Sequence, residues 1–145
     1  FIFDFLANIV DINSAMFNKN QKKQICQTFQ NLILKFPNST NLQSSIFNFI
    51  RKSLHTRDFA QRILDNYINL FIIVGKGEQR TAASANSLSF LSELESMRSS
   101  SYMIGKSLSG NRKYIDFYNS FFKNYLDELK RPYGGNIQRY SLKKQ

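Results

Sequence analysis

The sequence predicts an all-α protein, and three observations support that fold class. The 145 residues include only six glycines and two prolines, so long stretches contain no helix breaker. Apolar residues recur every three or four positions, which is the spacing of one helix face. No alternation of apolar and polar residues, the pattern of a half-buried strand, extends beyond about four residues. We expect a single helical domain over residues 1–131 and a basic, mobile tail over residues 132–145.

Helices are expected in the N-terminal half over residues 1–12, 20–36, 41–54 and 57–74. The first segment is apolar on most sides, which predicts a largely buried helix. Pro37 ends the second helix, and Thr40 or Asn41 can cap the third. Thr56 is the expected N-cap of the fourth helix, and Gly75 is expected just beyond its last residue.

The C-terminal half is expected to contain one weak helix, one long loop and one strong helix. Residues 78–97 carry a leucine stripe, Leu88, Leu91 and Leu94, at helical spacing. Residues 98–111 are rich in serine with two glycines and predict a loop. Residues 112–130 repeat aromatic residues every three to four positions and predict the best helix of the chain.

The regular spacing of these elements along the chain predicts how the helices are arranged. A helix and its connection recur about every 20 residues, which is typical of stacked helical hairpins. We therefore expect a right-handed superhelical stack of about six or seven helices, in preference to a closed four-helix bundle.

The sequence contains no recognisable catalytic or metal site. Nucleophilic catalysis needs a nucleophile, a base and an orienting group, yet the chain has one cysteine, Cys26, and one histidine, His55. Cys26 is expected to be a buried thiol, and His55 a helix-end residue. The longest apolar run is Leu70 to Val74, too short to span a bilayer. We expect a non-enzymatic protein without cofactor or metal, located in the cytoplasm or at the periphery of membranes.

The charge balance predicts an anionic partner. The chain has 20 basic and 10 acidic residues, a formal net charge of +10. Such an excess favours a phosphate-bearing membrane, a nucleic acid or an acidic protein as partner. The candidate anion-binding residues are Lys19, Lys22, Lys23, Arg51, Lys52 and Arg57, with Arg62 close by in sequence. A secondary basic surface comprises Arg98, Lys106, Arg112, Lys113, Lys130 and Arg131.

Most aromatic residues fall at the helical spacing of a core, so they are assigned to packing rather than to base stacking. Tyr133 and Tyr140 lie outside any such stripe, beside arginines. These two are the only aromatic residues expected to make surface contacts.

The order of features in the middle of the chain resembles a known superfamily. Residues 46–54 (IFNFIRKSL) are followed by a Thr56-Arg57-Asp58 turn and an apolar helix closed by Gly75. A later stretch begins Tyr-Ile-Asp-Phe at residue 114 and ends Tyr-Leu-Asp-Glu at residue 128. This order is similar to the ANTH, ENTH and VHS domains of membrane trafficking, ANTH in particular, over roughly residues 20–130.

The resemblance implies an ANTH/VHS-like α-solenoid that binds phosphoinositide headgroups through a lysine-rich stretch at the start of its second helix. The matching place is Lys22-Lys23-Gln24. The family has His or Tyr at the position of Gln24, and a further Lys near Asp11.

The expected function is that of an adaptor module docking on phosphoinositide-containing membrane in endocytic or vesicle trafficking. One alternative is a helical scaffold subunit whose basic surface docks on an acidic protein lattice. A second alternative is nucleic-acid binding driven by charge alone.

Overall fold

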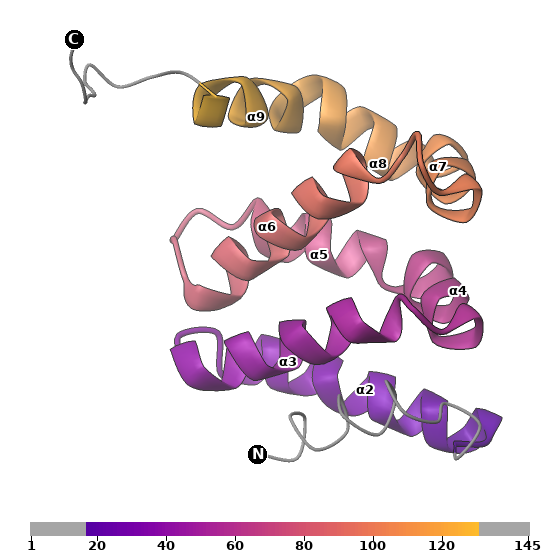
Figure 1. Ribbon diagram of the computed structural model, residues 1–145. Helices are drawn as coiled ribbons and strands as arrows, with labels where there is room; N and C mark the ends of the chain where they lie inside the picture. The colour runs from indigo at the N-terminus through magenta and orange to yellow at the C-terminus, as the bar shows by residue number, and fades with distance from the viewer. Residues whose placement is uncertain (1–16, 131–145) are drawn as a thin grey trace, which may run out of the picture. The chain divides into compact units, whose positions relative to one another are not determined.

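A computed structural model describes residues 17–130, and this part of the chain consists of helices and short connections without any strand (Figure 1). The all-α fold class is therefore confirmed. The predicted helix over residues 1–12 and the predicted tail over 132–145 lie outside the described residues. The helices are α2 (Lys19–Lys35), α3 (Thr40–Ser53), α4 (Arg57–Asn66), α5 (Ile68–Gly75), α6 (Ala82–Ser96), α7 (Tyr102–Ser109), α8 (Arg112–Phe117), the π-helical η2 (Tyr118–Phe122) and α9 (Lys123–Lys130).

The chain divides into two compact units, Phe1–Tyr114 and Ile115–Gln145. Helix α8 contains the boundary between them, so α2 to α7 belong wholly to the first unit. The predicted extent of a single domain, residues 1–131, stays a prediction. Within residues 17–130, no helix has the length and apolarity needed to cross a membrane.

Three phenylalanine rings form the centre of the first unit. Phe47 of α3 lies 5.6 Å from Phe71 of α5 and 6.4 Å from Phe90 of α6, measured between ring centroids. The rings of Phe71 and Phe90 are 5.2 Å apart, and all three side chains are fully buried. Each such ring removes a large apolar area from water. These contacts hold α3, α5 and α6 together.

Local sequence sets where the helices begin. Asn18 and Gln21 form a reciprocal capping box at the start of α2, with bonds of 2.8 and 2.9 Å. Thr81 and Ser84 do the same at the start of α6. The predicted caps of α3, Thr40 or Asn41, are wrong, because Ser39 is the N-cap and its carbonyl accepts the first helical bond from Gln43.

The single helix predicted over residues 57–74 is two helices. The chain turns at Tyr67, which has φ −120° and ψ −6° and separates α4 from α5. The turn buries the Tyr67 ring against Phe29, with 5.1 Å between the ring centroids. Gly75 is the last residue of α5 rather than the residue beyond it. A Cβ at Gly75 would lie 2.8 Å from Leu88, so α5 and α6 pack very closely there.

The loop predicted over residues 98–111 is wrong, because Tyr102–Ser109 forms helix α7. The Ser101 side chain caps it by accepting a bond from the backbone N–H of Ile104. Ile104 and Leu108 lie one turn apart and are both buried. A helix of eight residues is marginal on its own, so this burial stabilises it.

The strong helix predicted over residues 112–130 is helical throughout, with the π-helical segment η2 in its middle. In the second unit the ring of Phe117 stacks on that of Phe122 at 4.9 Å between centroids. The ring of Tyr125 extends this aromatic stack, nearly parallel to the rings of Phe121 and Phe122. Helix α9 itself contains no buried residue.

Candidate anion-binding face

Three hollows adjoin one another along α4, and their linings include residues of α2, α7 and the start of α8. The α2–α4 hollow has about 320 Å³, the α4–α7 hollow about 420 Å³ and the α4–α8 hollow about 370 Å³. Asp65 lines all three, and Ser107 and Gly110 line the last two. The hollows are therefore neighbouring parts of one surface.

Positive charge dominates this surface. Two carboxylates, those of Asp58 and Asp65, line it. The basic side chains among the described linings form what we call the basic face: Lys19, Lys22, Arg57, Arg62, Lys106, Arg112 and Lys113. Residues from α2, α4, α7 and the start of α8 thus converge, although they are up to 94 positions apart in the sequence.

Lys22 contributes charge to the face but is held within the fold. Its side chain is only 9% exposed, and its Nζ lies 3.1 Å from Oδ2 of Asp58. The same ammonium lies 5.6 Å from the centroid of the Phe59 ring, a cation–π distance. Lys22 therefore fastens α2 to the first turn of α4. Lys19 and Lys23 beside it are exposed, and Lys23 lines none of the three described hollows.

Arg62 lines the α2–α4 hollow and carries an unsatisfied buried donor. Among the described residues, its Nε is buried and has no hydrogen-bond partner. Asp65, three residues further along the same helix, accepts a bond of 2.7 Å from Gln61. A buried donor without an acceptor costs about 1–3 kcal/mol. Arg62 was close to the predicted residues but was not among the predicted anion ligands.

The α4–α7 hollow combines two cations with an exposed aromatic ring. Arg57 is the first residue of α4, Lys106 belongs to α7, and both are exposed. The Lys106 Nζ lies 5.8 Å from the centroid of the Tyr102 ring, which is 82% exposed. Sequence reasoning missed Tyr102 because it assigned this segment to a loop. The spacing of four between Tyr102 and Lys106, offset from Ile104 and Leu108, was the available signal.

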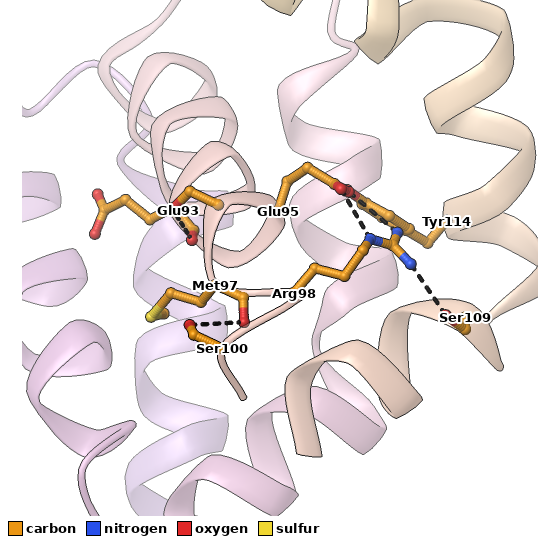
Figure 2. A network of polar contacts seen from close by, with 8 residues as sticks. Glu93, Glu95, Met97, Arg98, Ser100, Ser109 and Tyr114 are labelled. Carbon is orange, nitrogen blue, oxygen red and sulfur yellow. Dashed lines mark hydrogen bonds and ion pairs between the residues drawn. The ribbon is translucent and has the colours of Figure 1, made fainter. Parts of the chain in front are cut away.

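Arg98, predicted for the secondary surface, is engaged in an internal network (Figure 2). Its Nε donates to Oε2 of Glu95 at 2.8 Å, and its Nη1 donates to Oγ of Ser109 at 3.0 Å. The hydroxyl of buried Tyr114 donates to Oε1 of the same glutamate at 2.5 Å. The network ties the end of α6 to α7 and to the start of α8.

Electrostatics in this network favour the ion pair. Burial acts to raise the pKa of Glu95, but the hydrogen bonds from Arg98 and Tyr114 outweigh it and lower that pKa below its usual value. The hydrogen bond to Glu95 likewise raises the pKa of Arg98. Arg98 is thus a positioning residue for α7.

The remaining predicted residues are not brought to the basic face. Arg51 donates from Nε to Oε2 of Glu93 at 2.7 Å and from Nη2 to Ser89, which joins α3 to α6. Lys52 is half-buried on the same helix. Lys130 ends α9 in the second unit, and Arg131 lies outside the described residues, as do Tyr133 and Tyr140. Six of the twelve predicted residues therefore line the hollows: Lys19, Lys22, Arg57, Lys106, Arg112 and Lys113.

The side chains of the basic face can bind an anion. Guanidinium and ammonium groups donate strong, charge-assisted hydrogen bonds to phosphate oxygens. Burial raises the pKa of the Cys26 thiol to about 12, so this group is protonated and poorly nucleophilic at neutral pH. Among residues 17–130, no group of three or more His, Cys, Asp or Glu side chains is placed to hold a metal ion.

Comparison of the chain with protein-family models, with curated proteins and with solved structures gave no match.

Proposed function

We propose that this chain is a non-enzymatic adaptor module that docks through its basic face on phosphoinositide-containing membrane during endocytic or vesicle trafficking. The proposal rests on one observation above all. Three adjoining hollows are lined by seven basic side chains against two carboxylates, and the cations come from four different helices. Docking of this kind places the protein at the cytoplasmic periphery of a membrane.

The energetics of an anionic leaflet support this assignment. Each lysine or arginine held near such a surface contributes about 1 kcal/mol of attraction. Arg57, Arg112 and Lys113 are exposed, so they can approach phosphates with little desolvation. The hollows have volumes of about 320 to 420 Å³, at the lower end of the range of small-molecule sites.

The finer fold we propose for the first unit is an ANTH/VHS-like superhelical stack. Its support is the pattern of helix contacts. Besides sequential neighbours, α3 packs on α6 and α4 packs on α7. The Phe29–Tyr67 ring contact joins α2 to the residue that precedes α5. Packing between each helix and the third one after it is expected when the chain completes one superhelical turn in three helices.

Charge reversal on the basic face tests the proposed function. In the variant R57E/R112E the two introduced carboxylates would repel the leaflet that the exposed arginines attract. We expect co-sedimentation with vesicles containing phosphatidylinositol bisphosphate to weaken by about 30-fold or more, since two contributions of about 1 kcal/mol are lost. The measurement is the bound fraction against lipid concentration, with circular dichroism to verify the fold.

The matched control is K76E/R80E, which changes the net charge equally but lies in the connection between α5 and α6, outside the three hollows. We expect it to bind like the wild type. Equal losses in both variants would mean that net charge alone acts. Failure of the wild-type chain to bind any anionic vesicle would exclude the proposed function and leave an acidic protein or a nucleic acid as the partner.

A further inference from the structure

We propose that the α4–α7 hollow is the part of the basic face that meets the lipid, with the Tyr102 ring lodged among the headgroups. This inference rests on the proposed function and adds to it a contact residue and an orientation. It assigns membrane contact to α7, away from the lysine-rich start of α2.

The exposure of Tyr102 is the first observation. Its side chain is 82% exposed, the highest value among the exposed large hydrophobic residues of residues 17–130. Leu34 and Ile73, for comparison, are 53% and 69% exposed. A tyrosine ring has an apolar body and a polar hydroxyl, so it is favoured at the level of lipid headgroups, where each end finds its preferred surroundings.

The charges around the ring are the second observation. Lys106 lies against the ring at 5.8 Å, and Arg57 lines the same hollow. Arg112 and Lys113 line the adjoining α4–α8 hollow, which shares Ser107 and Gly110 with it. Two cations therefore share the hollow with the ring and two more line the adjoining hollow, against the single carboxylate of Asp65, an arrangement complementary to a surface of lipid phosphates.

The geometry of α7 fixes the direction of the ring. Tyr102 and Lys106 lie one turn apart, as do the buried Ile104 and Leu108. The two pairs are offset by two residues, about 200° around the helix, so one edge faces the core and the other faces outward. Two contacts hold α7 in this orientation. Arg98 donates a hydrogen bond to Ser109 (Figure 2), and Gly105 packs closely on the Arg98 carbonyl.

Base stacking by Tyr102 is less favoured. Proteins that bind single strands by stacking use several aromatic platforms along the strand. Among the described linings of the three hollows, Tyr102 is the one aromatic residue. A single aromatic ring beside cations is better suited to contact a layer of lipid headgroups than to stack on several successive bases.

A fluorescence experiment on the full chain tests the inference directly, because the chain contains no tryptophan. The Tyr102→Trp variant carries one reporter at the proposed contact. We expect its emission to shift to the blue on vesicles containing phosphatidylserine and phosphatidylinositol bisphosphate, and to be quenched when the vesicles carry brominated acyl chains. The matched control is Leu34→Trp, exposed near the far end of α2, whose emission should change little on the same vesicles.

Binding measurements on Tyr102→Ala complete the test. We expect its affinity for these vesicles to fall by roughly tenfold, since the ring loses much of its favourable burial. Vesicle binding with an unshifted emission of the Tyr102→Trp variant and an unaffected Tyr102→Ala variant would overturn the inference while the proposed function stands. Absence of vesicle binding in every variant would overturn both. Quenching of the Tyr102→Trp variant by an oligonucleotide, with no response to vesicles, would assign the hollow to nucleic acid.

Discussion

Cys26 lies fully buried on α2, in the environment expected of a structural thiol. Burial raises its pKa to about 12, and the nearby Arg62 guanidinium opposes that rise only in part. In the unfolded chain the pKa returns to about 8.5. The prediction that Cys26 is a buried thiol is confirmed.

This difference predicts a loss of stability at alkaline pH. Below about pH 8.5 both states keep the proton, and the stabilisation is fully present. As the pH rises from about 8.5 towards 12, the unfolded state loses the proton first, so the free energy of unfolding falls. Between about pH 7.5 and 10 we expect the wild-type chain to lose roughly 1–2 kcal/mol more than Cys26→Ala, as measured by urea unfolding. Equal losses in the two chains would contradict the assignment, since other titrating groups are common to both.

Lys22 shows why a cluster of basic residues cannot be treated as a set of free ligands. Its ammonium is held by Asp58 and by the Phe59 ring. Reversal of this charge would place a carboxylate beside another in a largely buried position, at a large cost in stability. Loss of binding by such a variant would therefore report unfolding as readily as a lost lipid contact. Arg57 and Arg112, which are exposed, give the cleaner test.

Helix α7 depends on one close approach of backbone to backbone. A Cβ at Gly105 would lie 2.6 Å from the carbonyl oxygen of Arg98, a distance that side-chain Cβ atoms do not reach. The carbonyl belongs to the backbone and has little freedom to move. Glycine at this position thus lets α7 pack against the end of α6, at the expense of about 1 kcal/mol in helix propensity.

We therefore expect Gly105→Ala to destabilise the protein by about 1–3 kcal/mol, because overpacking outweighs the gain in helix propensity. The melting temperature, followed by circular dichroism, should fall by several degrees. Each kcal/mol lowers it by roughly 2–8 °C in domains of about 60 to 250 residues. Gly77→Ala is the comparison, since its nearest foreign atom would be 3.3 Å away. If the two variants melted at the same temperature, the close approach at Gly105 would not limit the packing of α7.

At the scale of the whole molecule, the net charge of +10 acts together with the local basic face. Attraction between exposed charges reaches about 10 Å at about 0.1 M salt but only about 3 Å at about 1 M. A surface that binds mainly through its charges must therefore release a membrane as salt rises.

We expect vesicle binding of the wild-type chain to weaken steeply between about 0.1 and 1 M salt, because screening removes most of the attraction. Sedimentation with vesicles containing phosphatidylinositol bisphosphate measures this dependence. Vesicles of phosphatidylcholine alone serve as the control and should bind weakly at every salt concentration. Binding that is strong and insensitive to salt would mean that apolar contact, rather than charge, carries the interaction.

The sequence predicted the long helices because their signals are local. Apolar residues at a spacing of three to four and a polar N-cap such as Thr56 act within a turn or two of the chain. The break at Tyr67 and the short helix α7 were not predicted, since each depends on burial against distant residues, Phe29 in the first case. A helix of eight residues gains its stability from such contacts rather than from its own propensity.

The basic face depends both on local sequence and on the packing of distant helices. The helical class, the surplus of cations and the residues able to carry charge can all be read from the amino-acid sequence. That Lys19, Arg57, Lys106 and Arg112 share one surface, while Arg51 and Arg98 are engaged elsewhere, follows from how the helices pack. The physical reason is that helix formation depends on neighbours within about four residues, whereas a shared surface depends on which helices pack side by side, as α4 and α7 do.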